Sequence, residues 1–184
     1  AGGTGDIAFK IFQKYNKLQT KFQLKIADYN EEMILAGKDR AIDQNVIGSN
    51  VSWHHENGEK TSFKANEFDL YTIAYGIRNF ADLEQGVKEA SRILKQNGKF
   101  FCLEFNQVEN EMLKKIYDFY SFNFIPQIGG LITGDKASYE YFVESIRTFP
   151  KSNEFAKMLK ANGFKEVKFE KLTLGLTTLY YAEK

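Results

Sequence analysis

The sequence predicts an α/β fold in which helices pack on both faces of a mostly parallel sheet. Three observations predict it: helical and strand patterns alternate along the chain, two of the expected strands are continuous apolar runs, and only three residues join the last two strands. Such alternation is typical of parallel strands connected by helices. The short final connection predicts an antiparallel hairpin, which puts one antiparallel strand at the edge of the sheet.

The first part of the chain predicts two helix–strand units. Residues 6–19 place apolar side chains along one helical face, and residues 22–27 predict a short strand. Residues 30–46 predict one or two helices with a break near Gly37. Residues 51–55 predict the next strand.

The middle of the chain contains the two apolar runs. Residues 68–75 and 99–105 predict strands that are buried on both faces. The helix between them is expected over residues 82–96, where Asn97-Gly98 provides a suitable C-terminal stop. Cys102 lies within the second run, and we expect it to be a core residue.

The last part of the chain predicts three helices followed by the hairpin. The helices are expected at residues 109–122, 136–147 and 152–162, and the hairpin strands at 166–173 and 177–183.

The composition argues against several classes of protein. The chain has 184 residues, a formal net charge of +1 and 43% hydrophobic residues, which fits one domain with one core. This balanced charge gives no basic stripe, so we expect no nucleic-acid partner. No apolar run reaches the roughly 18 residues that span a bilayer. Aromatic residues make up 15% of the chain, which fits either an aromatic core or a site for a flat, apolar substrate.

The glycine-rich start of the chain indicates a ligand site. Ala1-Gly2-Gly3-Thr4-Gly5-Asp6 leads directly into the first helix, where glycines let the backbone approach a ligand and the helix offers free N–H groups. Asp28 follows Gly5 by 23 residues, at the end of the next strand. A carboxylate there accepts both hydroxyls of a ribose, as in nucleotide-binding α/β folds, but Asp28 also fits a simple helix cap.

Other ligand classes fit the sequence less well. The glycine loop lacks the Lys-Ser/Thr ending of a phosphate-binding loop, which argues against ATP or GTP hydrolysis. A dinucleotide fits the spacing, but the antiparallel terminal hairpin favours a methyltransferase-type sheet. His54 and His55 are neighbours on a predicted strand, so their side chains point to opposite faces and chelate a metal poorly. We therefore expect no metal site.

Several later blocks resemble the UbiE family of ubiquinone and menaquinone C-methyltransferases. They comprise residues 68–79 (FDLYTIAYGIRN), 92–95 (RILK) with Gly98, 102–105 (CLEF), 117–122, 125–139 (IPQIGGLITGDKASY), 143–147 (VESIR) and 149–150 (FP). The similarity runs the full length of the chain. It implies a Rossmann-like class I methyltransferase sheet and transfer of a methyl group from S-adenosylmethionine to a ring carbon of a polyprenyl benzoquinol or demethylmenaquinol.

The resemblance also assigns residues to the cofactor. Gly3, Thr4 and Gly5 fall in the cofactor loop, and Asp28 falls at the ribose. Three further positions belong to the same expected site, namely Asn57, Gly58 and Ala74. Asn57-Gly58 lies where the family contacts the adenine side, whereas Ala74 occupies a position that can be Ser, so a hydroxyl contact is missing here.

Candidate catalytic residues follow the two apolar strands. Arg78-Asn79 lies just past residues 68–75, and ligands of such folds bind outside the carboxyl ends of the strands. Arginine stays protonated and is a poor base, so we expect Arg78 to hold a water molecule or the phenolate oxygen; the alternative is a structural pair with an acidic neighbour such as Asp82. Glu104 lies at the end of the next strand. Its expected role is a base or an orienting group, and the alternative is a carboxylate that stabilises a loop.

The remaining candidates lie in the block after residue 124. Asp135 is a candidate site residue that also fits a helix cap, and Tyr139 is placed to stack on the quinol ring. The ring-rich residues 117–125 fit buried helix packing, a lid over a prenyl tail, or a contact with a membrane surface.

The departures from the family pattern lead to further expectations. The family has a helical segment and a first strand ahead of Ala1, so residues 1–184 are expected to form a single methyltransferase domain that lacks its N-terminal segment and has its first strand missing or incomplete. The family's usual Lys-Pro-Gly-Gly turn is replaced by Lys95-Gln96-Asn97-Gly98, and a usual Ser is replaced by Asn106. Both changes lie at expected surface turns or strand ends, so we expect them to have little effect. A non-catalytic scaffold subunit, and an O- or N-methyltransferase of another small aromatic, are the alternative functions. The expected partners are a polyprenyl quinol, a membrane surface, and a second copy or a quinone-synthesis complex, in a cytoplasmic or membrane-peripheral location.

Overall fold

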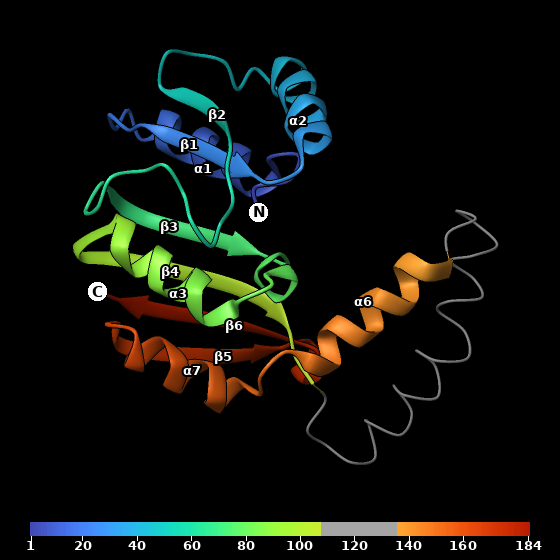
Figure 1. Ribbon diagram of the computed structural model, residues 1–184. Coiled ribbons are helices and arrows are strands. Elements are labelled where there is room, and N and C mark those ends of the chain that lie inside the picture. Colours follow the sequence, from blue (N-terminus) through green and yellow to red (C-terminus); the bar gives the residue numbers. More distant parts are fainter. Residues whose placement is uncertain (108–135) are drawn as a thin grey trace.

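A computed structural model describes residues 1–107 and 136–184 of the chain (Figure 1). The helices are α1 (Asp6–Lys17), α2 (Glu31–Asp43), α3 (Leu83–Ile93), α6 (Lys136–Thr148) and α7 (Ser152–Ala161), with short 3-10 turns η1 (Ile77–Asn79) and η2 (Thr173–Gly175). The strands are β1 (Leu24–Asp28), β2 (Val51–His55), β3 (Phe68–Ala74), β4 (Leu94–Phe105), β5 (Lys165–Leu172) and β6 (Thr177–Glu183). The predicted alternation of helices and strands is confirmed for the described residues. The helix expected at 109–122 lies outside them.

The strands form two sheets that combine parallel and antiparallel pairs. β1 pairs with β2 in parallel, and the second sheet has the order β3-β4-β6-β5. β3 and β4 run parallel, whereas β6 is antiparallel to both β4 and β5. The predicted C-terminal hairpin is therefore confirmed, but its antiparallel strand is not at the edge. β6 folds back between β4 and β5, where both of its edges are hydrogen-bonded.

Two predicted element boundaries are wrong. α2 is one unbroken helix that runs through Gly37. A glycine fits this position because the Trp53 ring packs against it: a Cβ on Gly37 would lie 2.4 Å from that ring. α3 ends at Ile93 and Leu94 already belongs to β4, so Asn97-Gly98 does not close the helix. Asn97 instead adopts a left-handed conformation (φ 63°) and donates its backbone N–H to the Lys184 carbonyl at 2.9 Å.

The main core lies between one face of the four-stranded sheet and helices α3 and α7 (Figure 1). Burial alternates along β4: Phe100, Cys102 and Glu104 are fully buried, whereas Phe101 and Leu103 are half-buried. The prediction that the apolar strands are buried on both faces is therefore wrong, because the intervening side chains are only partly covered. Cys102 is a core residue, as predicted.

The end of β4 also holds an unexpected buried polar group. Asn106 is 2% exposed, not at the surface, and its Nδ2 donates to Ser152 Oγ at 2.7 Å. Ser152 Oγ lies 3.3 Å from Thr178 Oγ1, so a small polar cluster lies beneath α7. Replacing this asparagine should therefore cost more than the sequence suggests, since a buried polar partner would be lost.

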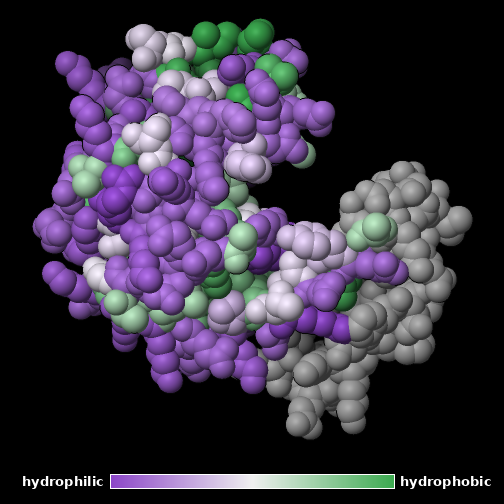
Figure 2. All heavy atoms as spheres, viewed as in Figure 1, coloured by the Kyte–Doolittle hydropathy of each residue, from purple (hydrophilic) through white to green (hydrophobic). Residues whose placement is uncertain are grey.

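The surface in the view of Figure 2 is largely hydrophilic, with apolar side chains gathered over the end of α2. Ile42, near the end of α2, and Ile47, which follows α2, are 62% and 61% exposed. None of the helices in the described part of the chain is both long and apolar enough to cross a membrane.

The Gly37–Trp53 contact gives a test of the fold. Alanine normally stabilises a helix by about 1 kcal/mol relative to glycine, but Gly37→Ala should destabilise the protein because overpacking a core typically costs about 1–3 kcal/mol. Urea unfolding should show a lower midpoint, whereas Lys38→Ala, at the exposed next position, should change little. A Gly37→Ala protein more stable than the parent would show that the ring does not block this position.

Candidate functional site

The glycine-rich loop closes over the carboxyl end of β1. The Gly2 N–H donates to the Ala27 carbonyl at 2.7 Å, and the Gly3 N–H donates to Asp28 Oδ2 at 2.7 Å. Gly3 and Gly5 have φ angles of 53° and 88°, which favour glycine. A Cβ on Gly3 would meet nothing within 4 Å, so the loop backbone faces open space there. This is the cradle that a ligand needs for close approach to the backbone.

Asp28 fastens this loop and does not cap α2. Its Oδ1 accepts the Asn30 N–H at 2.8 Å, while its Oδ2 holds Gly3. The N-cap of α2 is Asn30, whose Oδ1 accepts from the Glu32 and Met33 N–H groups. The helix-cap alternative for Asp28 is therefore wrong. Each carboxylate oxygen retains acceptor capacity, so Asp28 can still accept the hydroxyls of a ribose.

Thr4 is held from the side by α2. Arg40 Nη1 hydrogen-bonds to the Thr4 hydroxyl, and Arg40 Nη2 contacts Asp6 Oδ1 at 2.6 Å. The hydrogen bond from Arg40 lowers the pKa of Asp6. Sequence reasoning missed Arg40, which pins the loop although it lies 36 residues beyond Thr4.

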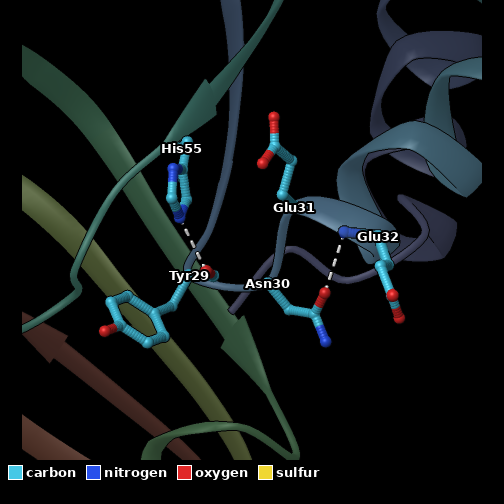
Figure 3. Close-up of a pocket in the computed structure, with 5 residues that line it drawn as sticks. All are labelled: Tyr29, Asn30, Glu31, Glu32 and His55. Carbon is cyan, nitrogen blue, oxygen red and sulfur yellow. Dashed lines mark hydrogen bonds between the residues drawn. The ribbon is translucent and has the colours of Figure 1, made fainter.

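An open hollow of about 460 Å³ lies beside Asp28, lined by residues 29–32 and His55. Figure 3 shows Tyr29 and His55 on one side of it and the Glu31 carboxylate on the other. His55 Nε2 lies 2.8 Å from the Tyr29 carbonyl oxygen, and Tyr29 is 72% exposed. An exposed ring next to a ribose-type carboxylate fits a flat base. Tyr29 was not predicted from the sequence. Its position directly after Asp28 could have indicated that it lies beside the site.

Asn57 and Gly58 lie in the turn that follows β2. Asn57 Oδ1 accepts the Glu59 N–H at 2.9 Å, and the Asn57 carbonyl accepts the Lys60 N–H at 2.9 Å. A Cβ on Gly58 would lie 2.3 Å from the Phe80 ring, so only glycine fits there without a shift. The turn is thus packed on the segment that follows η1.

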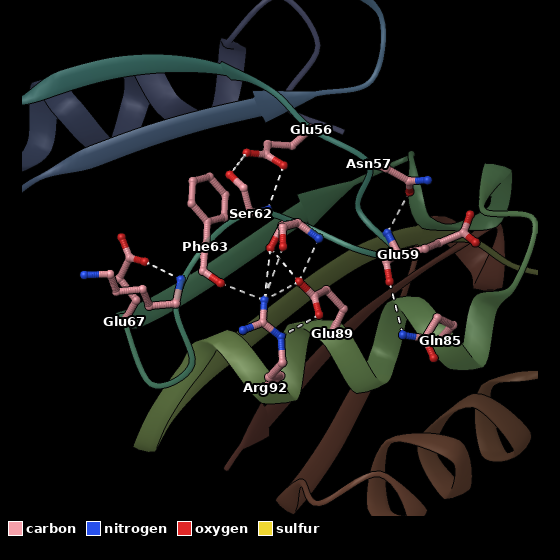
Figure 4. A network of polar contacts seen from close by, with 11 residues as sticks. Glu56, Asn57, Glu59, Ser62, Phe63, Glu67, Gln85, Glu89 and Arg92 are labelled. Atoms are coloured by element: carbon pink, nitrogen blue, oxygen red, sulfur yellow. Dashed lines mark hydrogen bonds and ion pairs between the residues drawn. The ribbon is translucent and has the colours of Figure 1, made fainter.

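A polar network fastens the stretch after this turn to α3 (Figure 4). Glu89 is 5% exposed; its Oε1 accepts the Thr61 N–H at 2.8 Å and the Thr61 hydroxyl at 2.5 Å. Arg92 donates to both Glu89 oxygens and, at 2.7 Å, to the Phe63 carbonyl. Burial by itself would raise the pKa of Glu89, but the hydrogen bonds from Arg92 and Thr61 outweigh it, and the pKa is lowered.

Arg78 and Glu104 form a buried ion pair at the ends of β3 and β4. Arg78 Nη1 lies 2.8 Å from Glu104 Oε1, and the two side chains are 9% and 0% exposed. Glu104 also accepts the Arg78 N–H at 3.3 Å and the Phe105 N–H at 2.8 Å. Burial raises the pKa of Glu104, and Arg78 partly offsets it. The alternative partner Asp82 is excluded, since Asp82 caps α3 through Gln85 N–H.

Further contacts fix the Arg78 guanidinium in place. Nη1 donates to the Tyr75 carbonyl at 2.5 Å, and Nε donates to Ser145 Oγ at 3.3 Å. The guanidinium carbon lies 5.4 Å and 5.3 Å from the ring centres of Phe105 and Phe142. Nη2 donates no hydrogen bond to any described residue, so its two N–H groups can bind a ligand oxygen.

The end of β3 is strained where it meets this pair. Tyr75, directly after Ala74, has a φ of 56°, which is uncommon for a residue with a side chain. Ala74 is half-buried and brings no hydroxyl. Asn79 is exposed, and its Oδ1 accepts the Tyr141 hydroxyl at 3.4 Å. Tyr141, on α6, is a further residue that sequence reasoning missed.

The loop and the ion pair meet at Ala1. A Cβ on Gly76 would lie 2.2 Å from the Ala1 Cβ, so the start of the glycine loop touches the turn that carries Arg78. The structure therefore brings together the cofactor-loop residues, Asp28, Arg78 and Glu104 at one edge of the fold. Asp135 and the Tyr139 side chain lie outside the described residues. Within residues 1–107 and 136–184, no three His, Cys, Asp or Glu residues form a group that could hold a metal ion.

Comparison with known proteins gives a consistent picture. All of residues 1–184 match the family described as the ubiE/COQ5 methyltransferase family. The ubiquinone/menaquinone biosynthesis C-methyltransferases UbiE of Rickettsia prowazekii and Rickettsia felis are 45% and 46% identical over 184 residues, which is 100% of this chain and 74% of each relative.

Solved structures share the fold at low sequence identity. A phosphoethanolamine N-methyltransferase of Haemonchus contortus, solved with S-adenosylhomocysteine, has a TM-score of 0.69 at 13% identity over 100% of this chain and 47% of its own. A SAM-dependent methyltransferase of Aquifex aeolicus has a TM-score of 0.67 at 13% identity over 99% and 78%. These likenesses support the class I methyltransferase fold.

The Glu89 network predicts a pH-dependent stability. Because the folded pKa of Glu89 lies below its ordinary value of 4.5, its stabilisation is present above that value and is lost as pH falls through the folded pKa. Glu89→Gln should lower the free energy of unfolding at pH 7 by about 1–3 kcal/mol and flatten its decline towards acid. Urea unfolding across this pH range measures both effects. Glu84→Gln, which removes an exposed pair with Lys88 on the same helix, should change little; equal effects of the two variants would contradict the network's role.

Proposed function

Because the chain belongs to the ubiE/COQ5 methyltransferase family, we propose that it is an S-adenosylmethionine-dependent C-methyltransferase of ubiquinone and menaquinone biosynthesis. Its substrate is a quinol precursor, a polyprenyl benzoquinol or a demethylmenaquinol. The observation that supports this function is the contact between Ala1 and Gly76. Through it, the glycine loop that Asp28 holds lies next to the turn of Arg78, which forms a buried ion pair with Glu104. Cofactor and acceptor can thus meet at one edge.

The residues around Asp28 fit S-adenosylmethionine. When bound, this cofactor supplies an electrophilic methyl group on a sulfonium sulfur. We propose that the Asp28 carboxylate accepts the ribose hydroxyls. We also propose that the cofactor closely approaches the backbone at Gly3 and Gly5. Tyr29 offers an exposed ring to the base, and the turn of Asn57-Gly58 borders the same side. Thr4 is held by Arg40 and so shapes the loop.

Arg78 carries the acceptor chemistry. A ring carbon becomes nucleophilic when a neighbouring phenol loses its proton, so the site must stabilise a phenolate oxygen. The N–H groups of Nη2, which bond to no residue in the described part of the chain, supply two donors on a fixed cation, next to Asn79. Glu104 is occupied by three N–H donors. We therefore assign Glu104 the role of orienting Arg78 and not of a base. Asp135 and Tyr139 stay predictions from the sequence.

Paired variants test the assignment of roles. Asp28→Asn should weaken S-adenosylmethionine binding by roughly 10- to 100-fold, since a hydrogen bond to a charged group contributes about 1.5–3 kcal/mol. Arg78→Lys keeps a cation beside Glu104 but loses the planar fork, so it should lower the rate of methyl transfer about 100-fold with cofactor binding unchanged. Calorimetry and a methyl-transfer assay on the quinol separate the two effects.

A control variant sharpens that test. Asp69→Asn removes an exposed carboxylate on β3 that pairs with Lys95, and both readouts should stay at the parent level. Parent-level binding in Asp28→Asn together with parent-level turnover in Arg78→Lys would overturn the site assignment.

We also propose that α1 contacts an anionic membrane surface, where a prenylated substrate resides. Lys10, Lys14 and Lys17 lie on one exposed face of α1, at spacings of four and three residues. Ile7 and Leu18 are 43% and 62% exposed on the same side. Basic and apolar side chains together on one helix face are typical of binding at a lipid surface, and each lysine near it contributes about 1 kcal/mol. Association with a second copy or with a quinone-synthesis complex stays a prediction from the sequence.

Vesicle binding tests the α1 surface. Co-sedimentation with phosphatidylserine vesicles should exceed that with phosphatidylcholine vesicles, and replacing the three lysines by glutamine should abolish the difference. The matched control replaces Lys157, Lys160 and Lys165, which are exposed elsewhere. Equal loss in both triple variants would point to overall charge and contradict a specific role for α1.

A further inference from the structure

Helix α6 contacts the Arg78 guanidinium through a buried polar side chain, Ser145. This serine is 6% exposed, and its hydroxyl donates to the Phe142 carbonyl at 2.9 Å. With its hydrogen committed to that carbonyl, the oxygen can only accept from Arg78, whose Nε–H it meets at 3.3 Å. The hydroxyl orientation is therefore fixed by α6 itself.

The guanidinium has five N–H donors in a rigid plane. Three contacts use two of its nitrogens: Nε to Ser145, and Nη1 to the Tyr75 carbonyl and to Glu104. The other two donors, on Nη2, bond to none of the residues 1–107 and 136–184. A planar group held at Nε and Nη1 cannot rotate about its own axis, so the direction of the Nη2 donors is set by Ser145 at Nε together with Glu104 and the Tyr75 carbonyl at Nη1.

Two rings restrict the guanidinium further. Phe105 from β4 and Phe142 from α6 lie at 5.2 Å from one another with an interplanar angle of 87°, and both lie within cation–π distance of Arg78. One wall of this enclosure therefore belongs to the sheet and the other to α6. Glu104 pairs with the positive charge of Arg78, but the orientation of the Nη2 side of the guanidinium also depends on α6.

We infer that Ser145 is a positioning residue that orients Arg78 for the acceptor oxygen and thereby couples the docking of α6 to catalysis. The inference rests on the proposed function, in which Nη2 binds the phenolate. Without the Ser145 hydroxyl, Nε loses its acceptor and Arg78 can turn towards other partners. Cofactor binding at Asp28 does not involve this contact.

Ser145→Ala tests the inference in this chain. We expect kcat to fall by about 10- to 100-fold, as for small misplacements of a catalytic group, with the Kd for S-adenosylmethionine unchanged. A well-placed cation lowers the pKa of a phenol, so the rise of kcat with pH should move to higher pH in the variant. The control is Thr148→Ala, which removes a hydroxyl one turn away on α6; among the described residues this hydroxyl bonds to carbonyls of its own helix. This variant should keep the parent rate and profile.

A second readout does not depend on turnover. The ¹⁵N-resolved NMR signal of the Arg78 Nε–H, assigned with Arg78→Lys, should be protected from exchange in the parent and in Thr148→Ala but not in Ser145→Ala. If Ser145→Ala unfolds, Ser145→Cys keeps the volume with a weaker acceptor and should show the same changes in milder form. A folded Ser145 variant with parent kcat, pH profile and Nε–H protection overturns the inference. A parent protein without methyl transfer overturns the proposed function instead, while the NMR signal still decides whether Ser145 orients Arg78.

Discussion

The buried ion pair between Arg78 and Glu104 is the contact on which the site side of the fold depends. Glu104 is fully buried at the end of β4, and it accepts N–H groups from two backbone positions as well as from the guanidinium. Removing one partner of such a pair typically costs about 3–5 kcal/mol, because the other charge stays buried without compensation. The pair therefore fixes the η1 turn against β4 and gives α6 its docking point. The strained backbone at Tyr75 is tolerated because its carbonyl is held by the same arginine.

A second constraint organises the opposite side of the site. Asp28 holds the glycine loop through Gly3, and Arg40 holds it through Thr4, so the loop is fixed from β1 and from α2 at once. The two halves meet where Ala1 packs against Gly76. A methyltransferase must align an acceptor carbon with a methyl donor, and these contacts give each reactant its own rigid support. In the proposed function, the alignment of the two reactants then depends on how these two supports are placed relative to each other.

The division of labour between Glu104 and Arg78 follows from geometry. A carboxylate at this strand end offers a base on chemical grounds alone, and burial raises the pKa of Glu104. Its hydrogen-bond partners among the described residues are, however, donors that stabilise its charged form. A cation whose two Nη2 donors have no partner among the described residues is the better match for a developing phenolate. The reaction follows from the family to which the chain belongs, whereas the roles proposed for Arg78 and Glu104 follow from the contacts of these two residues.

The sequence by itself determined the fold class, the alternation of elements and the residues at the strand ends, because apolar periodicity, glycine spacing and family motifs are local properties of the chain. It predicted Asp28, Arg78 and Glu104 as candidates, but it left the cap at Asp28 and the partner of Arg78 open. Only the tertiary structure decided those questions, since Asn30 and Glu104 were as compatible with the sequence as the alternatives. It also decided that α2 continues through Gly37, that β6 lies inside the sheet, that Arg40 holds Thr4, that Tyr29 lines the hollow beside Asp28, and that Ser145 contacts Arg78. The physical reason is that each of these depends on contacts between segments distant in the chain, such as the Trp53 ring over Gly37, which no local pattern encodes.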